Sequence, residues 1–423
     1  MPDTAQKNTS PRRRAVITGI GPIAACGIGR EACWNGIHEG RSGIAPVTHF
    51  DASIFHARNA GEVRDWDPAQ FFPPHRLKRL DRYAQFAVAS ALLALEDARL
   101  PWSREAPDLR RGVSFGTALG GISNAEAEHA RFLKKGPRGV NQTLALQVFG
   151  GSAHSNIAIE CGFRGVGNTY SNSCASGAVA VGEALRYIRD GLADVIIAGG
   201  AEAPLCPLTF GSFDFIKTMS RWQGDPAAFA CRPFDKERDG FVMGEGVCSL
   251  VIEEHGHAVR RGARIYAEVL GYALNNDAFH MTTPLPGGES VIACMRAALS
   301  DAQLGPCDIG YVNAHASGTR MNDANEIMCI RSVFGDSPPP VSGTKPFTAH
   351  PLGATAAMET AICALALGDQ WLPPTLHHRT PDPACDADIV PNTGRAHRFR
   401  NAMNNAFGFG GANCSLVLGL VER

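Results

Sequence analysis

The chain has thirteen cysteines but no Cys-x-x-Cys pair. That spacing is typical of zinc and dithiol redox sites, so its absence argues against both. The net charge is only −1 at pH 7, and no global basic field favours nucleic acid or an anionic membrane. We see no secretory leader in the polar first ten residues and expect no apolar run long enough to span a bilayer. We therefore expect a cytoplasmic protein with free thiols, no metal site, no nucleic-acid partner and no membrane span.

What remains is the composition of an ordinary globular protein, with 44% hydrophobic and 19% charged residues over 423 positions. That length suits one large or two medium domains. Residues 1–12 read as a disordered tail. Beyond them, strand-like apolar runs alternate with longer helical segments, which predicts an α/β fold with mainly buried sheets. The runs are 15–21, 193–198, 248–252, 265–270 and 414–418, and the clearest helical segments are 83–98 and 288–302.

The chain also shows signs of an internal duplication. Residues 241–252 align with 407–418, and the segment that begins at Cys174 aligns at a similar offset with the segment that begins at His350. Matches of this kind, in a common order, favour two related halves, which we place at 13–260 and 261–423. Cys174 and His350 would then occupy equivalent helix N-termini, and a pseudo-twofold axis would bring them to one central site.

Cys174 lies in a small-residue turn, Asn-Ser-Cys-Ala-Ser-Gly, directly before an apolar helical run. The first N–H groups of a helix and the positive end of its dipole favour a thiolate there. This is the layout of a covalent nucleophile. The alternative is a buried structural cysteine, since free cysteine is among the most buried residue types.

Two histidines far from Cys174 in the sequence favour the catalytic interpretation of this cysteine over the structural one. His315 follows the strand-like residues 311–313, and His350 precedes a helix, with Lys345 five residues before it. A third feature is the glycine-rich loop Gly408-Phe409-Gly410-Gly411. So many glycines beside an aromatic indicate a backbone that approaches a ligand closely or moves, although a simple turn between strands is the other reading.

In order and spacing, these motifs resemble those of the β-ketoacyl-acyl-carrier-protein synthases, especially the elongating type II condensing enzymes. The resemblance runs from about residue 14 to about residue 421 and includes the segment 232–241. Several separated motifs in one order make it specific. It implies a thiolase fold, which is a duplicated five-layered αβαβα architecture, usually found as a dimer. It also implies that no cofactor is needed, because an acyl carrier protein presents the substrates on its phosphopantetheine arm.

The resemblance also implies roles for individual residues. Cys174 would carry the acyl chain as a thioester, and His315 and His350 would hydrogen-bond the malonyl thioester carbonyl and support decarboxylation. The backbone N–H groups of Cys174 and Phe409 would form an oxyanion hole. Lys345 matches a further catalytic position that orders the site, and Phe409 matches the gating aromatic. Other matching positions are the supporting residues Asp323, Glu326 and Glu359, the substrate-binding residues Leu119, Thr143, Leu144, Thr282, Ser317, Thr319 and Gly408, and the carrier-protein docking residues Arg76, Lys78, Arg79 and Arg138.

Some positions depart from the pattern of the family. The usual His-Gly-Thr-Ser-Thr-Pro is His-Ala-Ser-Gly-Thr-Arg over residues 315–320, followed by Met-Asn-Asp. This form looks more like polyketide and polyene ketosynthases than like housekeeping fatty-acid enzymes. Ala349 replaces a glycine, and Thr143-Leu144 replaces a pair of aromatic pocket residues. The predicted reaction is a decarboxylative Claisen condensation that elongates a fatty-acid, polyketide or polyene chain.

Three other readings stay open at this point. Residues 19–24 fit the G-x-G-x-x-A pattern of a dehydrogenase, although Pro22 would disturb the phosphate turn. A non-catalytic chain-length factor would share the fold but would lack the nucleophile. A degradative thiolase would need a second active-site cysteine near the loop 408–413, where the nearby Cys414 falls in a strand-like run that reads as core.

Overall fold

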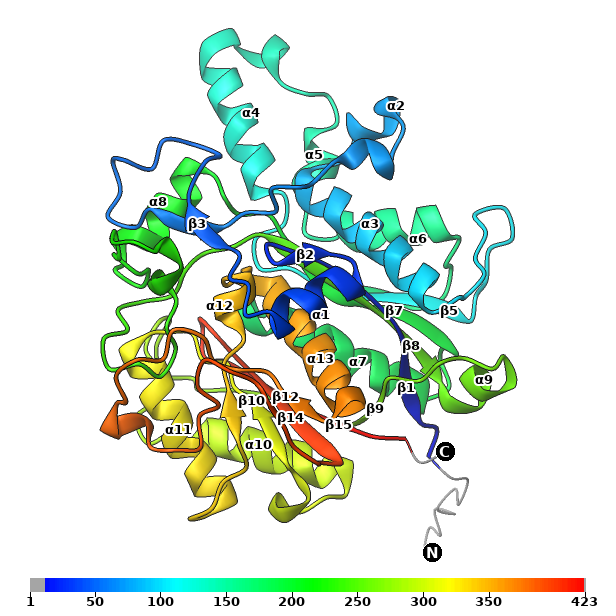
Figure 1. Cartoon of the computed structure of the whole chain (residues 1–423). Coiled ribbons are helices and arrows are strands. Elements are labelled where there is room, and N and C mark those ends of the chain that lie inside the picture. The colour runs from blue at the N-terminus through cyan, green and yellow to red at the C-terminus, as the bar shows by residue number, and fades with distance from the viewer. Residues whose placement is uncertain (1–11, 422–423) are drawn as a thin grey trace, which may run out of the picture.

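The computed structural model of the protein describes residues 12–421 (Figure 1). The predicted tail lies outside the described residues except for Arg12, whose guanidinium donates to the carboxylate of Asp301 at 2.8 Å. A sheet of eleven strands forms the framework. The path runs β11-β10-β14-β15-β9-β1-β8-β7-β5-β6, and β2 pairs with β1 off this path.

The two ends of this path have the same strand order. Numbered by sequence within each group, both groups run 3-2-4-5-1 from the outer edge to the centre. In both, the inner pairs are antiparallel and the outer pairs are parallel, and the groups meet where β1 pairs antiparallel with β9. The first group is β1 (Ala15–Ala24), β5 (Arg111–Gly116), β6 (Gly167–Tyr170), β7 (Val195–Glu202) and β8 (Gly246–Glu254). The second is β9 (Ala267–Asn276), β10 (Tyr311–Asn313), β11 (Val341–Ser342), β14 (Asn401–Gly408) and β15 (Ala412–Gly419).

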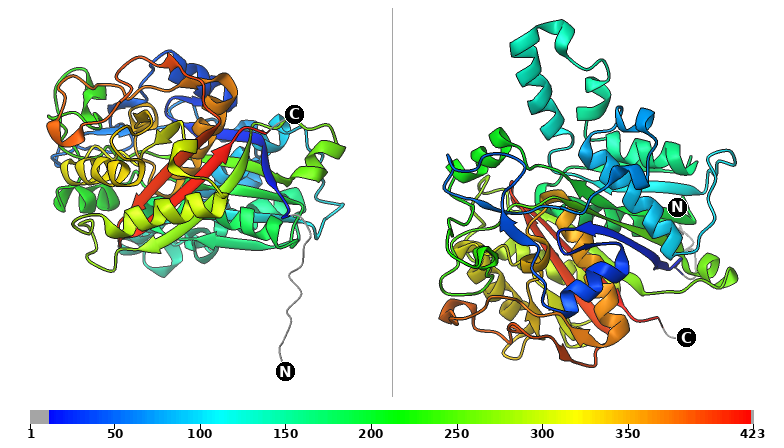
Figure 2. Two further views of the ribbon diagram at one scale, coloured as in Figure 1. Left: turned by 90° about the horizontal axis from the view of Figure 1, so that it is seen from below. Right: turned by 45° about the horizontal axis from the view of Figure 1, so that its top comes forward.

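Helices complete five layers around these strands. Two central helices, α7 (Ser176–Arg189) and α13 (Leu352–Asp369), lie side by side and contact strands of both groups (Figure 1). On the outer faces, α3 (Arg82–Asp97) packs on β1 and β8, and α10 (Glu289–Ala302) packs on β9 and β15, as the two views of Figure 2 show. The arrangement is the duplicated α/β architecture that the sequence indicates.

The central helices cross at small residues. A side chain on Gly177 would place its Cβ within 2.9 Å of the backbone nitrogen of Ala357 and 3.0 Å of the carbonyl oxygen of Gly353. Glycine at this point therefore lets the N-terminal turns of α7 and α13 approach closely. The residues just before these two helices, Cys174 and His350, are brought together by that approach.

One expectation about apolar segments is wrong. Helix α13 has 18 residues and is apolar enough to cross a membrane by length and composition. However, 89% of it is buried inside the protein, because it lies between the two groups of strands. It is therefore the core helix of the fold.

Two alternative readings of the sequence also fail on the fold. The residues 19–24 that fit a dinucleotide pattern lie inside β1, where Pro22 is part of the buried strand and no phosphate-binding turn forms. Cys414, the candidate second thiolase cysteine, lies inside β15 and is fully buried in the main hydrophobic core.

The remaining elements surround this framework. The short strands are β2 (Gly27–Ile28), β3 (Ile44–Pro46), β4 (Asn59–Gly61), β12 (Trp371–Leu372) and β13 (Arg395–Ala396). The other helices are α1 (Arg30–His38), α2 (Pro74–Leu77), α4 (Ile122–Lys135), α5 (Leu144–Val148), α6 (Ser152–Cys161), α8 (Pro207–Phe215), α9 (His255–Arg260), α11 (Arg320–Phe334) and α12 (Lys345–Thr348). Of these, α4 projects from the body of the molecule (Figure 1).

Candidate active site

Cys174 sits in a single 3₁₀ turn, Ser173–Ala175, that leads into α7. Its side chain is almost completely buried, and its Sγ lies 3.2 Å from Nε2 of His350. Burial raises the pKa of the Cys174 thiol, while the Ser173 hydroxyl, the charge of Lys345 and the backbone of Phe409 act in the opposite direction. The thiolate expected from the helix N-terminus is therefore not the resting form, because desolvation outweighs those contributions.

His350 directly precedes the turn into α13. Its Nδ1 forms a 2.7 Å hydrogen bond with the hydroxyl of Thr355, so Nε2 is the nitrogen that faces the thiol. Burial and the charge of Lys345 hold the pKa of His350 well below its usual range. The imidazole is therefore neutral at physiological pH.

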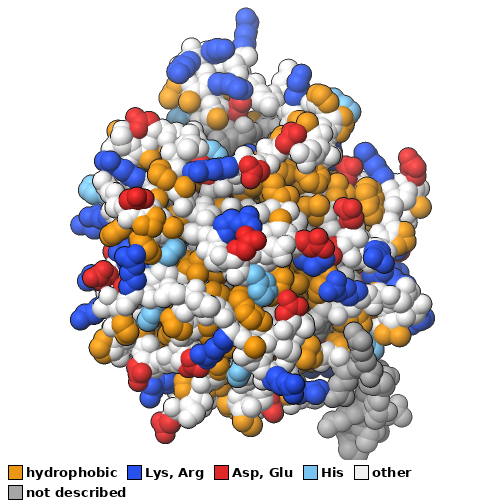
Figure 3. Space-filling view, viewed as in Figure 1, with side chains coloured by type: hydrophobic (Ala, Val, Ile, Leu, Met, Phe, Trp, Pro, Cys, Tyr) orange, Lys and Arg blue, Asp and Glu red, His pale blue; other side chains and the backbone are white. Residues whose placement is uncertain are grey.

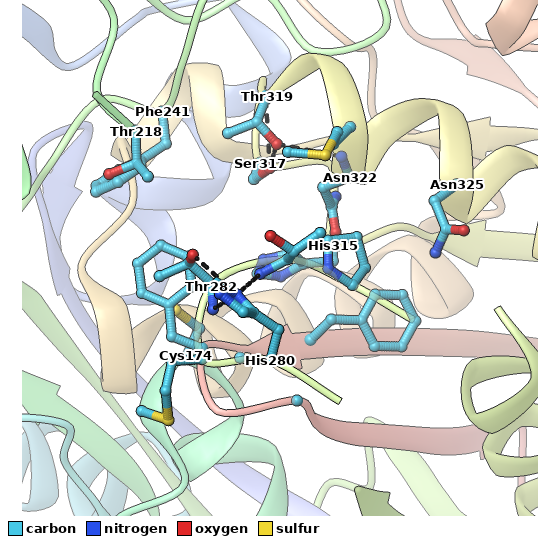
Figure 4. A pocket seen from close by; sticks show the side chains of 18 of the residues that line it. Cys174, Thr218, Phe241, His280, Thr282, His315, Ser317, Thr319, Asn322 and Asn325 are labelled. Carbon is cyan, nitrogen blue, oxygen red and sulfur yellow. Dashed lines mark hydrogen bonds between the residues drawn. The ribbon is translucent and has the colours of Figure 1, made fainter. Parts of the chain in front are cut away.

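His315 follows β10 and lies beside His350, with the two ring centroids 5.4 Å apart. Its backbone N–H donates to the carboxylate of Glu326 at 2.8 Å, and its buried Nδ1 has no partner among the described residues. Burial, followed by the charges of Lys345 and His350, holds the pKa of His315 well below its usual range. Two neutral imidazoles thus meet next to the thiol; Figure 4 shows His315 above Cys174.

A buried ion pair lies behind the histidines. Nζ of Lys345 lies 2.8 Å from the carboxylate of Glu359 and also donates to the backbone carbonyl of His315. Both side chains are at most 3% exposed. Burial raises the pKa of Glu359 to about 7, although Lys345 opposes that shift. The pair therefore places a fixed positive charge close to both imidazoles.

The loop 408–411 packs against the turn that carries Cys174. A Cβ on Gly408 would lie 2.9 Å from the carbonyl oxygen of Asn172 and 3.2 Å from the backbone nitrogen of Cys174. Gly410 and Gly411 have φ values of 84° and 78°, which favour glycine. Glycine at these positions therefore lets the backbone of Phe409 reach the thiol.

Two cavities meet at Cys174. The first, of about 330 Å³, reaches the thiol, His315 and His350 and is also lined by Thr282, Ser317, Thr319 and Gly408 (Figure 4). The second, of about 400 Å³, is lined by Leu119 and by the polar residues Ser171, Asn172, Ser173 and Asn276. Phe409 lines both cavities and stacks on Phe213, with ring centroids 6.2 Å apart. Two channels that converge on one thiol suit a substrate whose reacting group has a chain on each side.

Comparison with known proteins shows which family the chain belongs to. The model of the beta-ketoacyl synthase N-terminal domain matches residues 12–258, and that of the C-terminal domain matches residues 266–379. The chain is 39% identical to 3-oxoacyl-[acyl-carrier-protein] synthase 2 of Synechocystis sp. over 408 residues, covering 96% of this chain and 98% of that protein. It is also 39% identical to the enzyme of the same name from Coxiella burnetii, covering 97% and 99%.

The chain belongs to the β-ketoacyl synthase family.

Solved structures agree with this assignment. The ishigamide ketosynthase/chain length factor superposes with a TM-score of 0.91 at 36% identity, covering 97% of this chain and all of that one. The ketosynthase AntDE, solved in complex with its acyl-carrier protein AntF and bound to a hexaketide, gives a TM-score of 0.89 at 35% identity, covering 97% and 100%. The protein is thus an acyltransferase, a condensing enzyme of fatty-acid or polyketide chain elongation with the ketosynthase fold.

The two acids predicted to support the site contact the histidine loop, which is the segment 315–320 that begins with His315. Asp323 and Glu326 come from α11 and are buried. Glu326 accepts from the backbone N–H groups of His315 and Ala316, and Asp323 accepts from Gly318 at 3.1 Å. Burial raises the pKa of Glu326 to about 7, against the effect of those N–H donors.

Other predicted residues lie away from the two cavities. Thr143 and Leu144 line neither cavity, because they form the start of α5 and Thr143 hydrogen-bonds Asn141. Their role at the far end of the acyl pocket stays a prediction. In the docking segment, Lys78 and Arg79 are exposed, whereas Arg76 is half-buried, with its guanidinium 3.6 Å from Glu160. Arg138 is exposed beyond the projecting α4.

Sequence reasoning missed Glu202, which ends β7 and is fully buried. Its carboxylate accepts from the backbone of Ala118, Leu119 and Gly353 and so ties the wall of the second cavity to the first turn of α13. Burial raises its pKa to about 7. The available signal was an acidic residue at the end of an otherwise apolar strand. Thr355, the partner of His350, was also missed.

Proposed function

We propose that this ketosynthase condenses an acyl group held on Cys174 with a malonyl unit held on an acyl carrier protein, and that its acyl substrates are polyketide- or polyene-like. The observation that carries the proposal is the 3.2 Å contact between the Cys174 thiol and His350, with the neutral ring of His315 beside it. A thiol and two neutral imidazoles suit thioester exchange followed by enolate formation.

The first half-reaction loads the cysteine. The sulfur of Cys174 attacks the carrier thioester, the bond from the acyl carbon to the pantetheine sulfur breaks, and the thiol proton passes to the departing thiolate. The backbone N–H groups of Cys174 and Phe409 stabilise the oxyanion of the tetrahedral intermediate.

The second half-reaction extends the chain. The malonyl carboxylate leaves as CO2, and the electron pair passes into an enolate whose oxygen accepts hydrogen bonds from His315 and His350. Because both imidazoles are neutral, they stabilise the enolate without protonating its carbon. The enolate carbon then attacks the acyl-cysteine carbonyl, and the bond to Cys174 sulfur breaks to release the elongated β-ketoacyl carrier.

Two observations support a polyketide- or polyene-like substrate. The Ser-Gly-Thr-Arg form of the histidine loop resembles polyketide ketosynthases, and the second cavity has four polar lining residues rather than a wholly apolar surface. The similar solved structures include the ishigamide and AntDE ketosynthases. A saturated fatty-acid substrate is the competing outcome, and kcat/KM for saturated against conjugated acyl carriers of equal length decides between them.

The partner in both half-reactions is an acidic acyl carrier protein. Lys78, Arg79 and Arg138 are exposed, and the projecting region around α4 carries further lysines and arginines (Figure 3). A local basic patch can steer an acidic partner even though the whole chain is near neutral. Replacing both Lys78 and Arg79 by Glu should raise KM for a carrier-bound donor several-fold more than KM for a small thioester. Equal losses with both donors would mean instead that Lys78 and Arg79 stabilise the fold. Arg104→Glu, on an exposed loop, is the matched control.

We also propose that a second ketosynthase-like chain completes the working unit, as a homodimer or a heterodimer. The edge strand β6 offers unpaired backbone groups, and Phe132 and Leu133 are exposed on α4. Edge strands and clustered exposed apolar residues are both unfavourable in water.

All thirteen cysteines are free and twelve are buried, which supports a reducing, cytoplasmic setting.

Intact-mass analysis tests the central assignment. Acyl carrier donors should add one acyl group to the wild type and none to Cys174→Ala, whereas Cys307→Ala, which removes the exposed cysteine, should behave as the wild type. Cys174→Gln should keep malonyl decarboxylation, since His315 and His350 serve that step. An acyl adduct on the Cys174→Ala variant would overturn the proposal.

A further inference from the structure

Two cationic side chains line the outer part of the first cavity. Lys217 follows α8, and Arg320 is the first residue of α11. Both are exposed, and the cavity that they line leads inward to Cys174 and the two histidines. Their chain neighbours Thr218 and Thr319 also line the cavity, and Figure 4 shows them on separate segments of the chain. The two cations therefore come from different elements of the wall.

The acidic residues of the same cavity are already engaged. Asp239 accepts from the Ser220 hydroxyl at 2.8 Å and pairs with Arg232 at 3.2 Å. Asp277 accepts from the side chain of Asn413 at 2.7 Å and from the backbone of Leu285 at 3.0 Å. The carboxylates of Asp239 and Asp277 therefore already have hydrogen-bond or ion-pair partners among neighbouring protein groups.

The two cations, in contrast, are not neutralised. Within residues 12–421, neither Lys217 nor Arg320 forms an ion pair with a carboxylate. Arg320 uses its Nε to donate to the backbone carbonyl of Arg238 at 3.2 Å, which fixes the guanidinium and leaves its two terminal nitrogens for a ligand. Because the guanidinium of Arg320 is already oriented, it loses less conformational entropy on binding an anion than a free arginine side chain would.

The ligand that enters this cavity determines which anion these groups meet. Under the proposed function, on which this inference rests, the thioester end of a pantetheine arm reaches Cys174, and the other end of the arm stays at the opening. That end carries a phosphodiester, the one anionic group of the arm itself. Arginine recognises phosphate oxygens through two parallel N–H bonds, and lysine adds a point charge.

We propose that Arg320 and Lys217 bind the phosphodiester of the phosphopantetheine arm and so fix the depth to which the thioester enters. The position of Arg320 is occupied by proline in the His-Gly-Thr-Ser-Thr-Pro form of the family, and proline offers no donor at all. The site therefore distinguishes this chain from relatives with that form. It also lies apart from the docking segment of Lys78 and Arg79, which faces the carrier protein rather than its arm.

The test compares two small donors that differ only in the phosphate. Acyl-pantetheine and acyl-4′-phosphopantetheine both lack the carrier protein, so surface docking does not contribute. The wild type should acylate Cys174 about tenfold faster, in kcat/KM, with the phosphorylated donor, which is about 1.4 kcal/mol. In Arg320→Met the ratio of the two donors should fall to near one, and in Lys217→Met it should fall part of the way. Arg104→Met, on an exposed loop, should keep the wild-type ratio.

Using a ratio separates binding from folding, because a general loss of active protein cancels. A wild-type ratio near one, or a tenfold ratio that survives in Arg320→Met, would overturn the proposal. A second measurement needs no catalysis: free 4′-phosphopantetheine should protect Cys174 from iodoacetamide at a lower concentration than pantetheine does. If neither donor acylates the wild type, the proposed function fails, and this protection difference still decides whether the phosphate site exists.

Discussion

The contact between Gly408 and the nucleophile turn predicts that Gly408→Ala will be a selective defect in acylation. The φ of Gly408 is not in the left-handed region, so alanine fits the backbone and only space decides the outcome. The new Cβ would lie 2.9 Å from the oxygen of Asn172, 3.1 Å from Cβ of Ser173 and 3.2 Å from the nitrogen of Cys174. Most of these atoms belong to the backbone and cannot rotate away.

The loop must therefore retreat by a few tenths of an ångström. That movement carries the N–H of Phe409 away from the proposed position of the oxyanion. Loss of one oxyanion-hole donor costs about 10²–10³ in rate. We expect kcat/KM for acylation of Cys174 to fall about 100-fold, which corresponds to about 2.7 kcal/mol. Rapid-quench mass spectrometry of the intact protein measures it.

The matched control is Gly368→Ala. Gly368 lies in the last turn of α13 on the surface, and a Cβ there would meet nothing within 4 Å. The change should stabilise the helix by roughly 0.5–1 kcal/mol and leave acylation unchanged. If Gly408→Ala keeps the wild-type acylation rate while remaining folded by its melting temperature, Phe409 does not supply the oxyanion donor and the reasoning is wrong.

Four further outcomes are expected. Ala349 has φ 57° and ψ −158°, a region nearly exclusive to glycine, so Ala349→Gly should raise the free energy of unfolding by about 1 kcal/mol in urea titrations. The pH midpoint for alkylation of Cys174 should lie above the ordinary cysteine value, because burial raises the pKa of its thiol; a midpoint below it contradicts that balance. Because the pKa of His350 is lowered, its ring stays neutral as pH falls through the ordinary histidine range, and malonyl decarboxylation should persist there in steady-state assays. Lys345→Met should cost about 3–5 kcal/mol of stability in the same titrations, since it leaves Glu359 buried without its partner.

Much of the centre of this site could be predicted from the sequence because the fold repeats. The two halves share a strand order, so residues at equivalent positions, Cys174 and His350, approach each other across the crossing of α7 and α13. The small residues that permit this crossing are visible in both segments. The motif order also identified the correct family and reaction.

Other parts of the site depend on contacts that no local pattern records. Glu202 is 84 residues from Ala118 and 151 residues from Gly353, and its segment reads as an ordinary strand end. The direction of the Cys174 pKa shift was also inaccessible, because the helix N-terminus is visible in the sequence whereas desolvation depends on the loops that cover the thiol. Burial reverses the effect that local structure alone would predict.

Burial and one fixed charge together explain how the site keeps its groups in the protonation states that the chemistry needs. Desolvation alone would keep the proton on Cys174 and keep both imidazoles neutral. Neutral imidazoles favour an enolate, but a protonated Cys174 thiol opposes nucleophilic attack. The charge of Lys345 lowers the pKa of the thiol and also lowers the pKa of both histidines. A single buried cation, held by Glu359, therefore eases ionisation of the proposed nucleophile and further disfavours protonation of the two rings, which donate hydrogen bonds in the proposed reaction.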